Sequence, residues 1–172
     1  VSHENVFVSE STGALEAWLI DLDNLRHDSD PGRTFYTLGY GAPEILDGSS
    51  GATSMSDAWA FAVLVFHVLS LIHPFHGDIV EDGEPEMEEE ANAARLPWVE
   101  HPQDSRNRTR RGIPRESVLT KGMREGFAAT FEIGVKNVDR RATVASWVDR
   151  LHQAADGTVP CPGCGSTAFV MA

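Results

Sequence analysis

Two cysteines near the end of the chain have the spacing of a metal-binding pair. Cys161 and Cys164 lie in the sequence Cys-Pro-Gly-Cys-Gly, whose turn aims both thiolates at one ion. A structural zinc site needs four ligands, commonly two such pairs, and this sequence supplies one pair. The pair therefore predicts half of a zinc knuckle, which a histidine or a second copy of the chain would complete. A plain surface turn and a redox-active dithiol are the alternatives, although the thioredoxin-like context of a redox pair is lacking.

Four further groups of residues follow one another along the chain. Asn5 comes just before a short apolar segment, and Asp-Leu-Asp at 21–23 follows the next one. Gly-Ala-Pro-Glu at 41–44 closes a long polar stretch, and Ser-Asp-Ala-Trp at 56–59 opens the most hydrophobic one. Each group alone is typical of a turn or a helix cap. Their order along the chain, with a fifth group at 137–143, is the informative feature.

The elements that would position these residues begin with a β-hairpin. Residues 5–10 are β-branched and alternating, and residues 15–22 form a second apolar run. Ser-Thr-Gly at 11–13 supplies the turn between them. Residues 24–40 are polar and predict a long loop, and loops of more than about 12–15 residues are usually functional or disordered.

The rest of the chain is predicted to be mainly helical. Residues 56–71 are apolar all round, which predicts a helix buried on most sides and capped by Ser56 or Asp57. Amphipathic patterns at 114–131 and 143–154 predict two later helices. The expected fold class is therefore α+β, mainly α with one β-hairpin.

Length and charge limit the classes of function. The chain has 172 residues, of which 41% are hydrophobic and 23% charged, so it can build the core of one or two domains. Its formal net charge of −12 argues against a role in binding nucleic acid phosphates. No apolar run approaches the about 18–20 residues that cross a membrane, and the first residues do not form a secretory leader. We therefore expect no membrane partner and a cytoplasmic location.

Two stretches carry opposite charge. Residues 78–90 contain eight acidic side chains, and residues 104–115 contain five arginines. We interpret the acidic stretch as a solvated loop and an exposed helix, with an acidic docking site as the alternative. Mutual neutralisation is the simplest role of the arginines, and phosphate recognition is the alternative.

The ordered groups resemble the C-terminal lobe of a protein kinase. Residues 1–5 look like the end of the kinase catalytic loop, and residues 21–23 take the place of the Asp-Phe-Gly motif. The other matching motifs are Ala-Pro-Glu at 42–44, the Ser-Asp-x-Trp helix at 56–63, Pro-Phe at 74–75 and the Asp-Pro-x-x-Arg-Pro-Thr segment at 137–143. The resemblance covers residues 1–155 and implies a kinase C-lobe without its N-lobe. Residues 156–172 would be a linker and the cysteine tail.

The resemblance also implies which residues meet the cofactor. Asp21 would supply a carboxylate and Asn5 an amide oxygen to Mg²⁺, which bridges the phosphates of ATP. The hairpin would bring both ligands together, because they lie at the outer ends of antiparallel strands. Asp23 would either add a metal-facing carboxylate or cap the loop. Thr37, seven residues before Glu44, would support the catalytic loop and the substrate site, which favours Ser/Thr substrates.

Three residues would have structural and not catalytic roles in this lobe. Glu44 and Arg141 would form a buried ion pair that ties the activation segment to the late helices. Asp57 would hydrogen-bond the backbone of the catalytic loop from the central helix.

Several departures indicate a divergent, bacterial branch. Leu22 and Asp23 replace the Phe and Gly of Asp-Phe-Gly, and Ser2 stands in place of a phosphate-binding lysine. The sequence contains no Gly-rich loop, and the general-base Asp would precede Val1. We therefore expect a truncated Ser/Thr-type kinase, inactive as this isolated chain, with apolar surface that favours self-association. The alternative is a non-catalytic interaction module or pseudokinase remnant that binds a protein partner.

A narrower resemblance concerns bacterial kinases that carry a C-terminal zinc ribbon. Residues 19–25, residues 101–104 and the cysteine pair are similar to the kinases of tellurite-resistance-associated gene clusters. There the kinase accompanies a von Willebrand A protein and a phosphatase. The resemblance thus implies a von Willebrand A protein as partner, and zinc in addition to Mg-ATP.

Overall fold

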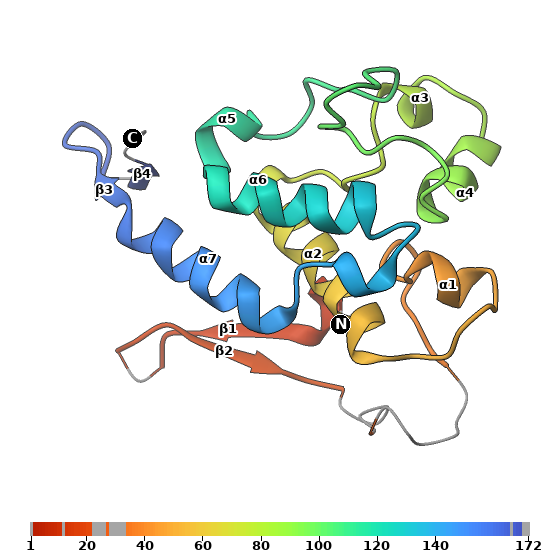
Figure 1. The fold of residues 1–172 in the computed structure, drawn as a ribbon. Coiled ribbons are helices and arrows are strands. Elements are labelled where there is room, and N and C mark those ends of the chain that lie inside the picture. The colour runs from red at the N-terminus through yellow and green to blue at the C-terminus, as the bar shows by residue number, and fades with distance from the viewer. Residues whose placement is uncertain (1, 12, 22–26, 28–33, 166, 170–172) are drawn as a thin grey trace.

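The computed structural model describes residues 2–11, 13–21, 27, 34–165 and 167–169 (Figure 1). Helices dominate the chain from residue 43 onward, and two short antiparallel sheets, each of two strands, lie at its two ends. The expected α+β fold class is confirmed. Within the described residues, no helix combines the length and the apolar character needed to span a membrane.

The predicted β-hairpin near the start of the chain is present. Strand β1 (Val6–Ser9) pairs antiparallel with β2 (Glu16–Leu19), so that Val6 lies opposite Leu19 and Ser9 opposite Glu16. A 3-10 turn, His3–Asn5, leads into β1. Both strands are shorter than the sequence pattern indicated.

Helix α2 (Ser54–Ser70) forms the centre of the molecule and lies behind α6 in Figure 1. It begins two residues earlier than predicted, because Thr53 caps it instead of Ser56 or Asp57. The Thr53 hydroxyl accepts from Ser56 N–H, and the Ser56 hydroxyl accepts from Thr53 N–H at 2.8 Å. This reciprocal capping box satisfies backbone donors that a helix start leaves open. As predicted, α2 is buried on most sides.

The other elements complete the fold. They are α1 (Pro43–Leu46), α3 (Asp78–Glu81), α4 (Glu86–Asn92), α5 (Arg115–Val118), α6 (Lys121–Ala128), a π-helical turn (Ala129–Ile133), a 3-10 turn (Val138–Arg140), α7 (Val144–Asp156), β3 (Thr158–Pro160) and β4 (Thr167–Phe169). The amphipathic patterns predicted two of these helices. The long pattern at 114–131 is divided into α5, α6 and the π-helical turn.

Aromatic rings fill the space between α2 and the later helices. The ring of Phe131 meets Trp59 at 5.3 Å and Phe75 at 5.5 Å between centroids, both edge to face. Phe66 meets Phe127 in the same way at 5.1 Å. Each such pair contributes about 0.5–1.5 kcal/mol beyond burial, so the packing of α2 is specific as well as apolar.

Replacement of Phe66 tests this core. Phe66 is 0% exposed, so Phe66→Ala leaves a cavity and is expected to lower the free energy of unfolding by about 3–5 kcal/mol. Val68 lies on the same helix and is 61% exposed, so Val68→Ala is the matched control and should cost less than about 0.5 kcal/mol. Urea unfolding followed by circular dichroism measures both. Similar losses for the two variants would contradict the assignment of the core.

Candidate functional site

The open end of the β1–β2 hairpin brings Asn5 and Asp21 together. The ladder continues one residue beyond the Val6–Leu19 pair, because Ile20 N–H donates to Asn5 O at 3.0 Å. Asp21 is the next residue and has a left-handed backbone conformation, with φ 58°. The two residues that the kinase resemblance assigns to Mg²⁺ are therefore neighbours at one end of the sheet.

Ser2 holds the side chain of Asn5. Ser2 is 1% exposed, and its hydroxyl donates to Asn5 Oδ1 at 3.4 Å. In return, Asn5 N–H donates to Ser2 O at 3.1 Å. An amide oxygen has two lone pairs, so Asn5 Oδ1 can accept from Ser2 and still face a cation.

The kinase resemblance assigns the oxygen atoms of Asn5 and Asp21 to a magnesium ion that arrives with a nucleotide. Within the residues that the structure describes, no group of three or more His, Cys, Asp and Glu side chains is placed to hold a metal by itself. Mg²⁺ prefers oxygen ligands, keeps several waters, and is usually bound by one or two protein oxygens together with substrate phosphates. Asn5 and Asp21 supply such oxygens. Asp23, the third expected ligand, lies outside the described residues.

Tyr40 links this end of the hairpin to the central helix. Its hydroxyl lies 2.8 Å from His3 Nδ1 and 3.2 Å from His67 Nδ1. A hydroxyl carries one proton, so Tyr40 donates to one histidine and accepts from the other. Burial raises the pKa of Tyr40 and lowers the pKa of His67, so both groups stay uncharged near neutral pH. No sequence motif predicted this network, and its one signal was the position of Tyr40 directly before Gly-Ala-Pro-Glu.

His73 holds the same segment from the other side. Its Nε2–H donates to Gly39 O at 2.7 Å, and its Nδ1 accepts from Phe75 N–H at 3.2 Å. These two partners require the neutral ring with the proton on Nε2. Burial, and then the neighbouring His76 ring at 4.2 Å, lower the pKa of His73 to about 3.

Thr37 begins the turn that these histidines hold. Tyr40 N–H donates to Thr37 O at 2.9 Å, and Gly39 has φ 81°, the conformation that a type II turn needs at its third position. The Thr37 side chain is exposed and, among the described residues, donates no hydrogen bond to residues 2–5. Tyr40 makes the contact with that segment that the sequence analysis expected of Thr37.

Glu44 and Arg141 form a two-pronged ion pair, in the arrangement that the sequence analysis expected. Arg141 Nη1 lies 2.6 Å from Glu44 Oε1, and Nη2 lies 2.7 Å from Oε2. Arg141 also donates to Gly134 O and to Met55 O, each at 3.0 Å, and stacks over the Trp59 ring at 5.0 Å. Its side chain is 0% exposed and that of Glu44 is 14% exposed.

Asp57 does not have the position expected of it. It lies in the first turn of α2 and is exposed, and within the described chain its carboxylate accepts no hydrogen bond from residues 2–5. The capping box of Thr53 and Ser56 already satisfies the helix start, so nothing draws the carboxylate inward. It stays in water, where the positive end of the helix dipole favours it.

The cysteine pair lies at the tip of the β3–β4 hairpin. Cys161 follows β3 and is half-buried, whereas Cys164 is exposed. Gly165, with φ 72°, donates its N–H to Cys161 O at 2.9 Å and closes the turn. The two cysteines therefore flank a closed turn at the hairpin tip, and zinc binding there stays a prediction. Among the described residues no third His, Cys, Asp or Glu joins the pair in a metal-binding group.

Neither a protein-family model nor a curated protein matches this sequence. The site is defined by its motifs and by the contacts between them. The contact with the greatest weight is the Glu44–Arg141 pair, because it joins two motifs that are 97 residues apart.

The first prediction for this region concerns the ion pair. Glu44→Gln leaves the buried guanidinium of Arg141 without its counter-charge, and should lower the free energy of unfolding by about 3–5 kcal/mol. Glu90→Gln breaks the pair with Arg95. The side chain of Glu90 is 37% exposed and that of Arg95 is 62% exposed, so this substitution should cost less than about 1 kcal/mol. Chemical unfolding at low and high salt measures both. If Glu44→Gln lowers the free energy of unfolding no more than Glu90→Gln does, the buried pair does not stabilise the fold.

The second prediction concerns pH. His73 is neutral in the folded protein down to a pKa of about 3, whereas the unfolded chain takes up the proton near 6.5. The unfolded state therefore binds more protons between these values. The contribution of His73 to the free energy of unfolding is fully present above pH 6.5 and is lost as the pH falls toward 3. His73→Gln, which keeps a donor for Gly39 O, should reduce the slope of unfolding free energy against pH by up to about 1.4 kcal/mol per pH unit.

His152→Gln is the matched control for this measurement, because His152 is exposed on α7. Its slope should equal that of the wild type in urea unfolding from pH 7 to pH 4. An unchanged slope for His73→Gln would mean that the ring is protonated in the folded state.

Proposed function

We propose that this chain is the C-terminal-lobe part of a Ser/Thr-type protein kinase, which transfers the γ-phosphoryl group of ATP to protein hydroxyls. The observation that supports it most is the buried Glu44–Arg141 pair, since the kinase resemblance predicts it between motifs 97 residues apart. Local propensity cannot produce a contact over that distance. The order of elements, a hairpin, a long connecting segment and then helices, agrees with the same proposal.

In this proposal Asn5 and Asp21 are the metal ligands of the chain. Mg-ATP, when bound, supplies the phosphoryl group and neutralises the charge that develops on it. The contribution of the chain is to position these groups. The Asn5 oxygen is held by Ser2, and the turn at Tyr40 is fixed beside it by His67. Phosphoryl transfer depends mainly on such positioning.

Two parts of a kinase have no counterpart in this sequence. These are the Asp that accepts the proton of the substrate hydroxyl and the Gly-rich loop that covers the ATP phosphates. We therefore expect this chain by itself to bind Mg-ATP weakly and to transfer no phosphate. Activity would require further polypeptide that supplies these parts.

The exposed hairpin favours a second candidate, a non-catalytic kinase-like module that binds a protein. Phe7 and Trp18 lie opposite each other in β1 and β2 and are 58% and 56% exposed. Val8 and Leu19 are exposed to a similar degree. Apolar surface of this kind marks protein-interaction sites or self-association. The von Willebrand A protein implied by the narrower resemblance would be a partner of this candidate.

A kinase assay on the native gene product that contains this chain separates the two candidates. With Mg-ATP and a Ser/Thr substrate protein, Asp21→Asn and Asn5→Ala should each reduce phosphate transfer by about 100-fold or more, because each removes an oxygen that holds the metal. Glu10→Gln is the control, since Glu10 is exposed at the opposite end of the same hairpin. It should leave the rate unchanged.

The isolated chain of 172 residues should show no transfer in the same assay. Phosphate transfer that survives Asp21→Asn would overturn the kinase proposal. A native product that transfers no phosphate, but binds a partner through Phe7 and Trp18, would establish the second candidate in its place.

A further inference from the structure

The loop that leads into α5 is anchored from inside by Arg115. This side chain belongs to a residue that is 6% exposed, and its Nη1 donates to Arg111 O at 2.6 Å and to Ile113 O at 3.3 Å. Its Nη2 donates to Thr109 O, and its Nε donates to Glu100 Oε1 at 3.0 Å. One buried guanidinium thus fixes the backbone of three loop residues.

Asn107 and Thr109 anchor the same loop to its neighbours. Asn107 is 0% exposed and donates from Nδ2 to Phe75 O at 2.8 Å and to Pro97 O at 2.9 Å. Thr109 is 2% exposed, and its hydroxyl accepts from Arg111 N–H at 3.2 Å. The loop is therefore preformed, and ordering it on binding a ligand costs little.

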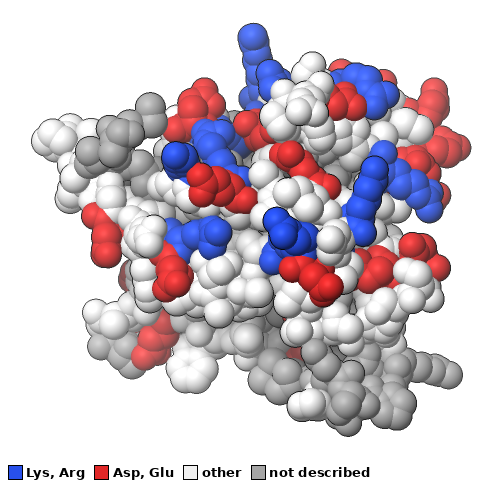
Figure 2. Space-filling view, viewed as in Figure 1, with Lys and Arg blue, Asp and Glu red and all other residues white. Residues whose placement is uncertain are grey.

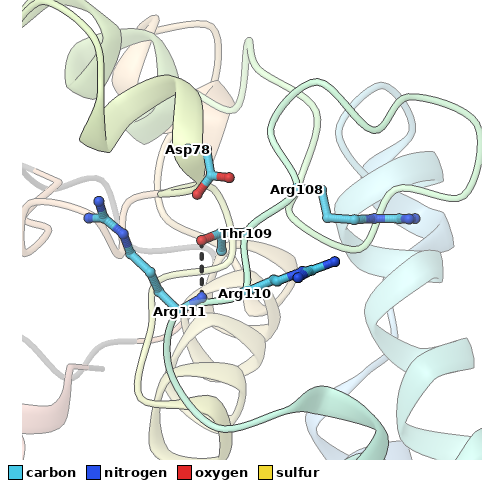
Figure 3. Close-up of a pocket in the computed structure, with 5 residues that line it drawn as sticks. All are labelled: Asp78, Arg108, Thr109, Arg110 and Arg111. Atoms are coloured by element: carbon cyan, nitrogen blue, oxygen red, sulfur yellow. Dashed lines mark hydrogen bonds between the residues drawn. The ribbon is translucent and has the colours of Figure 1, made fainter.

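The exposed arginines of this loop point in two directions (Figure 3). Arg111 extends toward α3, where it pairs with Glu81 and, at 3.6 Å, with Asp82. Arg108 and Arg110 extend to the opposite side and are exposed. In the part of the chain that the structure describes, neither of them forms an ion pair. Two guanidinium groups are thus left to face solvent together.

These side chains surround an open hollow of about 500 Å³. Its lining residues are Asp78, Arg108, Thr109, Arg110 and Arg111. In Figure 3 the Thr109 hydroxyl points toward the Asp78 carboxylate. The hollow therefore has a positive side, at Arg108 and Arg110, and one negative group, at Asp78.

The charges around the hollow select among anions. Arginine pairs bind phosphate monoesters well, because a guanidinium donates two parallel hydrogen bonds and the ester carries a charge of about −1.5 to −2 at neutral pH. A nucleic acid or an anionic membrane fits poorly, since the chain has a net charge of −12 and the face in Figure 2 intersperses acidic with basic side chains. Asp78 repels a free anion and attracts a cation. A peptide that carries one phosphate and one basic side chain matches both sides of the hollow.

We propose that Arg108 and Arg110 bind the phosphate of a phosphoserine or phosphothreonine peptide, and that Asp78 binds a Lys or Arg of that peptide near the phosphate. The site shares no residue with Asn5 and Asp21. It goes beyond the proposed phosphoryl transfer, and failure of either proposal leaves the other standing.

Calorimetric titration of the full chain with matched peptides tests the site. The peptides differ only in phosphorylation of one serine beside a lysine. At an ionic strength of about 0.15 M, the phosphorylated peptide should bind at least about tenfold more tightly, and Arg108→Gln with Arg110→Gln should remove this preference. Arg106→Gln is the matched control, because Arg106 is exposed in the same loop and pairs with Asp104 at 2.6 Å. It should leave the preference intact.

The role of Asp78 is tested separately. Asp78→Asn should weaken binding of the lysine-containing phosphopeptide relative to the same peptide with alanine in place of lysine. The proposal is overturned if both serine peptides bind equally, or if the preference survives the double substitution. It is also overturned if inorganic phosphate, or phosphatidylcholine vesicles containing a phosphoinositide, bind more tightly than the phosphopeptide. Arg108→Lys with Arg110→Lys, which keeps the charge and loses the paired hydrogen bonds, should retain only part of the preference.

Discussion

The buried guanidinium of Arg141 constrains the whole fold, because a fully buried charge needs acceptors inside the protein. Its acceptors come from three separate segments: the Glu44 carboxylate in α1, Met55 O in α2 and Gly134 O after the π-helical turn. The three segments must therefore meet around one side chain. The approach is so close that a Cβ at residue 134 would lie 2.6 Å from Arg141 Cγ, which leaves room only for glycine there. The end of the loop that carries Tyr40 is thus fixed by residues near the other end of the chain.

Neutral histidines complete this attachment. The turn at 37–40 is held by His67 at the end of α2 through Tyr40, and by His73 through Gly39 O. A charged ring at His73 would place a proton against Phe75 N–H, so the contact exists only in the neutral form. The histidine contacts hold this segment before residue 41, and the Arg141 pair holds it after residue 41, at Glu44. Together they hold that segment in position, and its Tyr40 contacts His3, two residues before Asn5.

Local patterns made part of this arrangement predictable from the sequence. Alternation over residues 5–10 predicted the first strand, and the strongly hydrophobic stretch over residues 56–71 predicted the central helix, although the helix begins earlier because Thr53 caps it. The approach of Glu44 to Arg141 could be expected only from the order of motifs, since no local signal joins them. The Tyr40 network could not be expected, because its histidine partners lie 37 and 27 residues away and single histidines carry no periodicity. The preformed loop around Arg115 could not be predicted for a similar reason. Residues 104–115 contain five arginines, and the sequence does not indicate which of them is buried.

The exposed face of the hairpin gives the protein an optical property. Of its four tryptophans, Trp59, Trp98 and Trp147 are at most 3% exposed, whereas Trp18 on β2 is 56% exposed. Three indoles therefore emit from an apolar interior, and one emits from water at longer wavelength. Quenchers such as acrylamide reach Trp18 first. The red edge of the emission spectrum consequently reports on the hairpin alone, and whatever polypeptide covers that strand shifts it toward the blue without a label.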